Sequence, residues 1–233
     1  MRVNRRTFQK SMIALLVAGI YSGGAFWFAR LAHSESRLRP PGAADEQAFL
    51  ASCIKCGQCV QVCPYHSLIL LDADQGLAVG TPIVDPLRRG CYLCDLLPCV
   101  LACPSGALSH DVTEARQVKM GIAVVDNPRQ CLSYQKEPVT QTMVDRLIAH
   151  GNQSDVEKDL ANQLNAAVGK PCTLCLDHCP YPDKTSAITM QNFIPEIGKN
   201  CVGCGVCAEL CPPQIIRMIP RKTYASVYEN LRD

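Results

Sequence analysis

Apolar residues along this chain come in short runs, separated by turns that contain glycine or proline. These runs predict β-strands at residues 67–71, 81–84, 121–125, 187–190 and 193–197. A glycine-containing turn separates the first two runs, so we expect them to pair as a hairpin. The same pattern predicts a short helix at residues 44–52 and, before it, a charged, proline-ended linker at residues 37–41.

A longer periodic pattern occurs between residues 132 and 171. Apolar side chains recur at every fourth position over residues 156–168, and Ser154 followed by Glu157 matches a capping box at the start of this helix. A shorter helix is predicted around residues 143–148. We interpret the two as a helical hairpin that covers one face of the protein, and a docking surface is the alternative.

The N-terminus combines basic residues with a long uncharged segment. The residues that define its pattern are Arg5, Arg6, Phe8 and Lys10. This order resembles a twin-arginine signal, which directs folded proteins across the cytoplasmic membrane. Residues 1–36 are therefore predicted to be a twin-arginine signal or a membrane anchor. Cleavage, or anchoring through the uncharged residues 11–29, stays open, and the expected location is periplasmic in both cases.

Composition adds one unusual feature. The chain of 233 residues is 48% hydrophobic and only 6% aromatic, but it contains 16 cysteines. Because bulky aromatic side chains are few, a group bound by cysteine is expected to help hold the core together. Lys and Arg total 23 and Asp and Glu total 21, and the resulting charge of +2 gives no support for a nucleic-acid partner.

All sixteen cysteines fall into four groups, and each group ends in Cys-Pro. Groups one and four share the spacing Cys-x2-Cys-x2-Cys-x3-Cys-Pro, and group two has two more residues before its third cysteine. Group three is shorter and takes the displaced Cys131 as its first member. The groups are Cys53, Cys56, Cys59 and Cys63; Cys91, Cys94, Cys99 and Cys103; Cys131, Cys172, Cys175 and Cys179; and Cys201, Cys204, Cys207 and Cys211.

The spacing of groups one and four is that of bacterial 4Fe-4S ferredoxins. Three close thiolates bind three iron corners of one cubane, and the fourth cysteine ligates the cluster of another group. Disulfides are disfavoured because the cysteines within a group are too close together to close long loops. Zinc is disfavoured because the trailing Cys-Pro recurs and the histidines fit no ligand pattern. The sequence predicts four 4Fe-4S clusters, with all sixteen cysteines as iron ligands.

No residue pattern indicates catalysis. The sequence contains no G-x-G-x-x-G, P-loop, His-Glu-x-x-His or serine-elbow motif. His66 and His178 lie close to cysteine groups, and we interpret them as neighbours of the clusters rather than ligands. Several basic residues could offset the negative charge of the clusters, meet an acidic partner or simply be solvated; these are Arg88, Arg89, Arg217, Arg221 and Lys222.

Three segments at or near the cysteine groups carry a further resemblance. They are residues 37–43 (RLRPPGA), 103–108 (CPSGAL) and 121–126 (GIAVVD). With the twin-arginine-like start, they resemble the NapG/MauM ferredoxin-type proteins over about residues 35–220. The resemblance implies an accessory electron carrier of periplasmic nitrate reduction or of methylamine utilisation. It also implies a membrane iron-sulfur quinol dehydrogenase, NapH-like, as partner.

The expected fold class is α+β, with two ferredoxin-like modules of two clusters each, a helical insertion at residues 132–171 and an N-terminal signal or anchor helix. A resemblance to the four-cluster subunits of molybdenum oxidoreductases implies a nested arrangement of the modules. Groups one and four would then share residues 37–90 and 181–233, and groups two and three would share residues 91–180. Sequential pairing, one with two and three with four, is the alternative.

The nested arrangement implies its own ligand sets. These are Cys53, Cys56, Cys59 and Cys211; Cys201, Cys204, Cys207 and Cys63; Cys91, Cys94, Cys99 and Cys179; and Cys131, Cys172, Cys175 and Cys103.

The expected function is electron transfer without an enzymatic activity of the chain's own. Electrons would pass from a quinol-oxidising membrane partner toward a periplasmic reductase, such as nitrate reductase, or a c-type cytochrome. The twin-arginine translocase is the expected export partner. The alternatives are a maturation or assembly factor for a periplasmic redox enzyme, and the iron-sulfur subunit of a molybdenum oxidoreductase.

Overall fold

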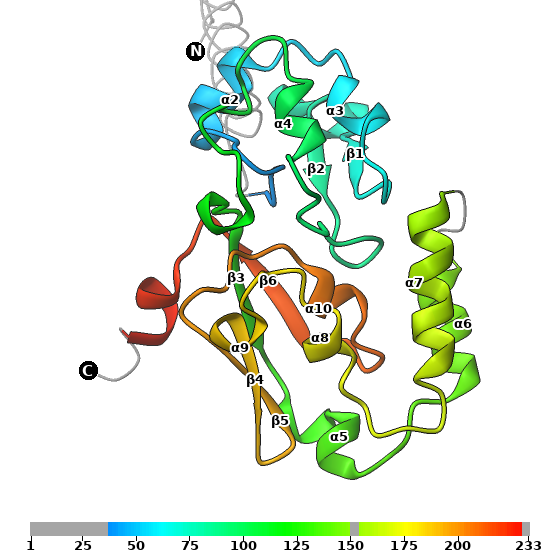
Figure 1. The fold of residues 1–233 in the computed structure, drawn as a ribbon. Helices are drawn as coiled ribbons and strands as arrows, with labels where there is room; N and C mark the ends of the chain where they lie inside the picture. The colour runs from blue at the N-terminus through cyan, green and yellow to red at the C-terminus, as the bar shows by residue number, and fades with distance from the viewer. Residues whose placement is uncertain (1–36, 150–153, 230–233) are drawn as a thin grey trace, which may run out of the picture.

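The computed structural model describes residues 37–149 and 154–229, a part of the chain that contains every cysteine (Figure 1). The predicted signal or anchor, residues 1–36, lies outside the described residues. Short helices alternate with two-stranded antiparallel sheets, which confirms the mixed α+β class. Within the described ranges, no helix is long and apolar enough to cross a membrane.

The element bounds follow the predicted runs closely. The helices are α2 (Glu46–Ser52), α3 (Gln58–Gln61), α4 (Pro98–Leu101), α5 (Leu132–Gln135), α6 (Gln141–Ile148), α7 (Asp155–Ala166), α8 (Leu174–Asp177), α9 (Lys184–Ala187) and α10 (Val206–Glu209). The strands are β1 (Leu68–Leu70), β2 (Pro82–Val84), β3 (Gly121–Val125), β4 (Ile188–Gln191), β5 (Ile194–Ile197) and β6 (Ile216–Pro220). Short turns of 3-10 or π-helix are η1 (Ala73–Ala78), η2 (Ala115–Gln117), η3 (Pro128–Gln130) and η4 (Ala225–Glu229). The five strand runs predicted from sequence correspond to β1 to β5.

The chain uses one order of elements twice. In the C-terminal half, β3 precedes group three, the β4–β5 hairpin separates groups three and four, and β6 follows group four and pairs antiparallel with β3. In the N-terminal half, the β1–β2 hairpin separates groups one and two, and a single bridge between Ala43 and Leu108 takes the place of the outer strand pair. Helix α3 contacts α4, and α8 contacts α10. Group one therefore packs on group two, and group three on group four.

This arrangement departs from the nested division that the resemblance implied. Each hairpin returns the chain directly from one cysteine group to the next, and the outer strands close around the same two groups. Groups one and four consequently do not share a module over residues 37–90 and 181–233, nor do groups two and three over residues 91–180. The sequential alternative describes the structure, and the two halves divide between Leu108 and Gly121.

The two halves meet where group two faces group four. The Cys91 N–H donates a hydrogen bond of 2.7 Å to the Cys204 carbonyl. A Cβ on Gly90 would lie 2.4 Å from the Val206 nitrogen, so only glycine permits this approach. The buried carboxylate of Glu209 accepts a 2.7 Å hydrogen bond from the Gly90 N–H, which fixes the segment before Cys91 onto α10.

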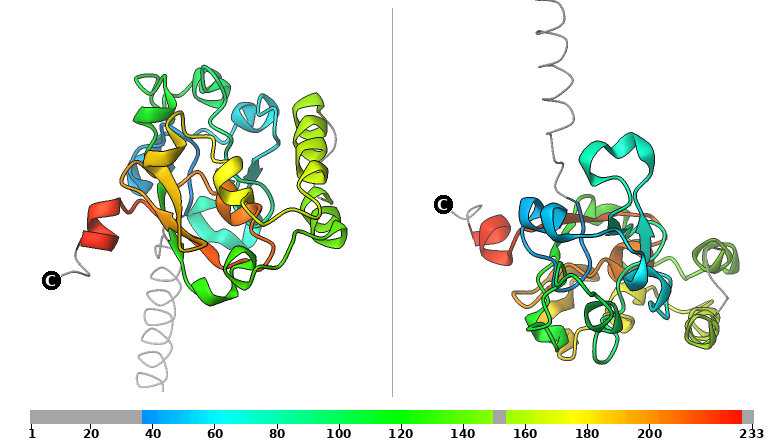
Figure 2. Two further views of the ribbon diagram at one scale, coloured as in Figure 1. Left: turned by 60° about the horizontal axis from the view of Figure 1, so that its bottom comes forward. Right: turned by 90° about the horizontal axis from the view of Figure 1, so that it is seen from above.

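Helices α6 and α7 stand at one side of the molecule, next to the region where the halves meet (Figures 1 and 2). Ser154 caps α7, because its Oγ accepts the Glu157 N–H and donates to the Pro64 carbonyl at 2.7 Å. The Glu157 side chain is buried, and its Oε1 lies 3.1 Å from His66 Nδ1 and 3.8 Å from Arg89 Nη2. The start of α7 is thereby fixed to segments that flank groups one and two.

Residues 37–41 are not a linker. Leu38 and Arg39 are buried, and the Arg39 guanidinium donates to Glu46 Oε2, to Thr81 Oγ1 and to the Pro82 carbonyl. The guanidinium also lies over the ring of Phe49, 4.8 Å from its centre. The first described residues are therefore part of the core of the N-terminal half.

Candidate metal centres

None of the sixteen cysteines, all of which lie in the described residues, forms a disulfide, and they gather into four sets of four. Each set combines three cysteines of one group with the fourth-position cysteine, or its counterpart, of the neighbouring group. Set A is Cys53, Cys56, Cys59 and Cys103; set B is Cys63, Cys91, Cys94 and Cys99; set C is Cys131, Cys172, Cys175 and Cys211; set D is Cys179, Cys201, Cys204 and Cys207.

Sets B and D each surround a small cavity. One cavity is lined by all four cysteines of set B and the other by all four of set D, and the rest of each lining is almost wholly apolar. Among the described residues, no three His, Cys, Asp or Glu side chains converge as they would on a single metal ion. A cubane distributes its four cysteine ligands over separate iron corners, and thiols spread around an apolar cavity fit such a group.

In sets A and C, the thiols raise the pKa of a cysteine in the same set, which indicates that they lie close together. Burial and the neighbouring thiols, Cys103 among them, raise the pKa of Cys59 to about 11. Burial likewise raises the pKa of Cys211 to about 11, with contributions from Cys172 and Cys131. The displaced Cys131 therefore lies close to the same thiol as Cys172 of group three, despite the long segment between the two.

Backbone N–H groups point at sulfur in sets A and B. The Ser67 N–H donates to Cys63 Sγ at 3.3 Å, and the Leu108 N–H donates to Cys103 Sγ at 3.5 Å. Although burial acts against it, hydrogen bonding from Leu108 and Ser105 lowers the pKa of Cys103. Such bonds favour the thiolate, which is the form that binds iron, and they tune cluster potentials.

Other thiols are buried without comparable compensation. Burial raises the pKa values of Cys91 and Cys207 well above the ordinary range for cysteine. A bound cation reverses this tendency, because a coordinating thiol is deprotonated outright. The donor set of buried thiols with nearby amides thus fits an iron-sulfur cluster in each set.

The additional residues of group two form a strained turn. Leu96 and Leu97 both adopt left-handed backbone conformations, with φ of 62° and 43°. Such conformations are unfavourable for residues other than glycine and tend to occur at functional sites. The turn lets Cys99 join Cys94 in set B although their spacing in the sequence is longer than in groups one and four.

The four sets form a series in the order A, B, D, C. Burial raises the pKa of Cys99 in set B to about 12, and Cys59 of set A is among the thiols that add to this shift. Cys204 of set D acts in the same way on Cys91 of set B. Sets D and C are adjacent as well, because Cys175 of set C adds to the effect of burial on Cys207.

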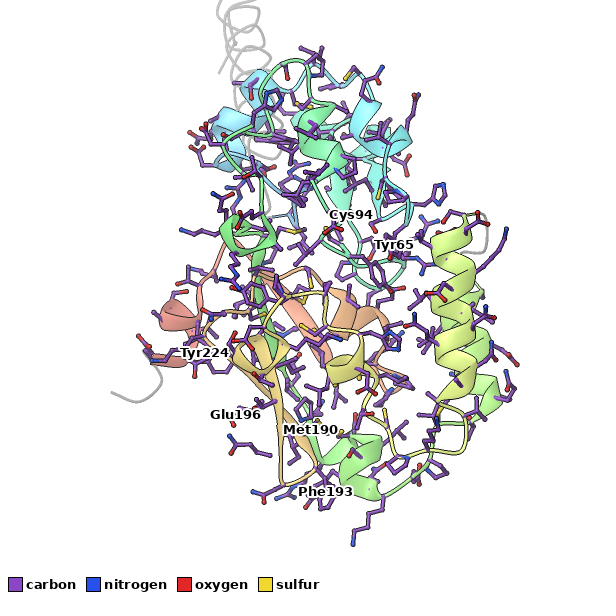
Figure 3. All side chains as sticks on the ribbon, viewed as in Figure 1. Tyr65, Cys94, Met190, Phe193, Glu196 and Tyr224 are labelled. Carbon is purple, nitrogen blue, oxygen red and sulfur yellow. The ribbon has the colours of Figure 1, made fainter. Side chains whose placement is uncertain are left out.

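An aromatic pair beside set B was not predicted from sequence. Tyr65 and Tyr92 stack with their ring centres 4.1 Å apart. Burial and the nearby Cys94 thiol raise the pKa of Tyr65, and Figure 3 shows the side chains of Tyr65 and Cys94 close together. The Tyr92 hydroxyl donates to Glu209 Oε2 at 3.2 Å. The only sequence signal for this pair is that each tyrosine follows closely after a cysteine of set B.

The histidines near the cysteine groups belong to none of the four sets. His66 lies against Glu157, and burial lowers the pKa of His178. Their interpretation as neighbours of the clusters stays a prediction.

Comparisons with known proteins give the site its context. A family of 4Fe-4S dicluster domains matches residues 52–107, the segment that contains groups one and two. The methylamine utilization ferredoxin-type protein MauM of Paracoccus denitrificans is 32% identical over 89% of this chain and 84% of that protein. MauM of Methylorubrum extorquens is 31% identical over 89% of this chain and 88% of that protein. No solved structure matches the chain significantly.

A second kind of relative covers less of its own length. The ferredoxin-type protein NapG of Escherichia coli is 31% identical over 75% of this chain and 66% of that protein. The dicluster domain and the sixteen cysteines indicate 4Fe-4S clusters, and the relatives indicate an iron-sulfur electron-transfer protein. The chain belongs to the NapG/MauM ferredoxin-type proteins.

Proposed function

We propose that the protein carries four 4Fe-4S clusters, one in each cysteine set, and conducts single electrons along the series A, B, D, C. The observation that carries the proposal is the contact between the halves, where Cys91 of set B donates its N–H to the carbonyl of Cys204 in set D. This contact makes two dicluster modules into one conductor. The clusters supply the redox chemistry, because they accept and release one electron at a time.

The protein's own residues hold the four sets in position and adjust the redox potentials of the clusters. Gly90 allows the closest approach between the halves, and Glu209 binds the backbone immediately before Cys91. The amide groups of Ser67 and Leu108 stabilise negative charge on the sulfurs of Cys63 and Cys103. The almost wholly apolar linings of the cavities in sets B and D keep water away from the middle of the series.

An exposed apolar side chain lies close to each end of the series. Cys56 of set A is exposed, next to Ile54, which is 63% exposed. At the other end, all four cysteines of set C are buried, but Cys131 Sγ lies 3.7 Å from the carbonyl oxygen of Phe193, whose own side chain is 60% exposed (Figure 3). Exposed apolar and aromatic side chains at both ends support entry and exit of electrons through partner proteins.

The proposed setting is the periplasmic side of the cytoplasmic membrane. The twin-arginine-like sequence in residues 1–36 supports export of the folded protein through the twin-arginine translocase. The membrane partner would be a NapH-like iron-sulfur quinol dehydrogenase. The acceptor would be a periplasmic reductase or a c-type cytochrome.

Metal analysis of anaerobically purified protein tests the proposal. We expect about sixteen iron and sixteen acid-labile sulfide per chain, and low-temperature EPR after dithionite should show interacting reduced clusters. Oxidation of the reduced protein by a periplasmic extract should restore the oxidised spectrum. Zinc in place of iron, or clusters that no oxidant restores, would refute the electron-transfer function and favour a role in assembly.

A further inference from the structure

A hollow of about 180 Å³ opens on the surface beside set D, and basic side chains surround it. We call it the basic hollow; its defining residues are Arg116, Lys119, Lys199, Lys222, Cys201 and Tyr224. The four cationic side chains are all exposed, and within the described part of the chain no acidic residue lines the hollow.

The strand pairing explains why these cations lie together. Lys119 precedes β3 and Lys222 follows β6, and these strands are antiparallel with Gly121 opposite Pro220. Both lysines therefore lie at the same end of the sheet. Lys199 reaches the hollow because it comes two residues before Cys201, in the segment that joins β5 to group four.

The positive charge of the basic hollow is only partly compensated. Lys199 Nζ lies 3.8 Å from an oxygen of Glu229, and both side chains are more than half exposed. The pKa of Asp183 is lowered first by hydrogen bonds with Thr185 and Ser186, and last by the positive charge of Arg116, which therefore has an acidic neighbour. Among the described residues, Lys119 and Lys222 take part in no ion pair.

The basic hollow is connected directly to set D. Cys201 is part of its lining, and the Ala123 and Gly203 amides hydrogen-bond this sulfur. Tyr224, labelled in Figure 3, stacks on Tyr228 with ring centres 5.0 Å apart. Burial and then the Cys201 thiol raise the pKa of Tyr228 to about 12, so this second tyrosine lies against set D. Set D therefore reaches the wall of the hollow through Cys201.

We propose that the basic hollow docks the acidic face of a redox protein, which exchanges electrons with set D. This inference rests on the proposed electron-transfer function. It adds a third place of electron exchange, at set D, to those at sets A and C. Exposed cations next to a redox centre steer an acidic partner and speed its encounter. A protein face fits better than a small anion, because small-ligand sites use convergent groups in an enclosed pocket, whereas these cations lie on an open surface beside an aromatic side chain.

Oxidation of the dithionite-reduced protein by small probes of opposite charge tests the inference. Each ferricyanide ion takes one electron from a reduced cluster and leaves as ferrocyanide, and hexaammineruthenium(III) is the cationic counterpart. At low ionic strength, the double variant Lys119→Glu/Lys222→Glu should slow oxidation by ferricyanide about tenfold. It should also flatten the salt dependence of that rate and speed oxidation by the ruthenium complex.

The matched control is Lys136→Glu/Lys170→Glu, which makes the same change of charge at exposed lysines outside the basic hollow. We expect its ferricyanide rate to stay within about twofold of the wild type. An equal loss in the control, or no loss in the hollow variant, would overturn the inference. Far-UV circular dichroism and iron content serve to check that both variants are folded and contain their clusters.

Competition identifies the kind of occupant. At constant ionic strength, poly-L-glutamate should slow ferricyanide oxidation of the wild type but not of the Lys119→Glu/Lys222→Glu variant. If inorganic phosphate competes as well as the polymer does, the basic hollow is a small-anion site and the docking inference is wrong. If neither oxidant takes electrons from the reduced protein, the proposed function itself fails, which is a different result from loss of charge selectivity.

Discussion

Arg39 is a charged side chain that the fold uses as an internal brace. It is only 3% exposed, and it joins Glu46 on α2 to Thr81 and Pro82 at the start of β2. The sequence predicted a linker here, because charge and proline in a short stretch are typical of exposed segments. The partners that bury Arg39 are distant in sequence, and neither periodicity nor local propensity reports such a contact.

Replacement of Arg39 by alanine should destabilise the protein by about 3–5 kcal/mol, because it leaves the Glu46 carboxylate without its principal partner. Arg39→Lys should have an intermediate effect, since lysine keeps the charge but not the planar fork of donors. Urea unfolding of the holoprotein, followed through cluster absorbance, measures both. Arg129→Ala at an exposed site is the control, and equal stability of Arg39→Ala and this control would contradict the bracing role.

Among the helices and strands, those whose sequence signal lies within a single segment were predicted correctly. The capping box of Ser154 and Glu157 and the four-residue apolar repeat predicted the helix that is α7, and the short apolar runs predicted β1 to β5. Strand β6 was not predicted, because Arg217 interrupts its apolar run and Pro220 ends it. Its pairing with β3 turns Arg217 outward, where it forms a 2.7 Å ion pair with Asp126.

Removal of the Ser154 hydroxyl should loosen α7. Ser154→Ala removes both the cap on the Glu157 N–H and the bond to the Pro64 carbonyl, and we expect a loss of about 1 kcal/mol. Amide hydrogen exchange in the first turns of α7 should speed up about fivefold. Thr140→Ala is a matched control, because Thr140 occupies the same cap position on α6 without a side-chain cap bond. Equal exchange rates in the two variants would show that the cap contributes nothing.

At the scale of the whole molecule, the cysteine spacing predicted how many sets form but not which groups combine. Every group has the same local chemistry, so spacing is compatible with nested and with sequential pairing. The contacts that decide are long-range: the outer pairs Ala43 with Leu108 and β3 with β6, and the close approach of Gly90 to Val206. Long-range packing of this kind leaves no periodic trace in the sequence.

Gly90→Ala should separate sets B and D. The new Cβ would meet the Val206 nitrogen and the Gly205 carbonyl carbon, both backbone atoms that cannot move aside cheaply. We expect full iron content, weaker spin coupling between the halves in reduced EPR spectra, and slower electron equilibration after rapid reduction. Gly169→Ala is the control for a destabilising glycine replacement away from the junction: its φ of 79° disfavours alanine, but the new Cβ would meet nothing within 4 Å. Unchanged spin coupling in Gly90→Ala would contradict the B–D junction.

The iron content of two double-cysteine variants distinguishes sequential from nested ligand sets in the series of four clusters. Cys63→Ala/Cys94→Ala removes two ligands from set B alone, so about twelve iron per chain should remain and no three-iron signal should appear. Cys63→Ala/Cys204→Ala removes one ligand from each of sets B and D, so two clusters should be lost or converted to three-iron clusters. The opposite result, with one cluster disturbed in Cys63→Ala/Cys204→Ala and two in Cys63→Ala/Cys94→Ala, would contradict the sequential sets and support the nested arrangement.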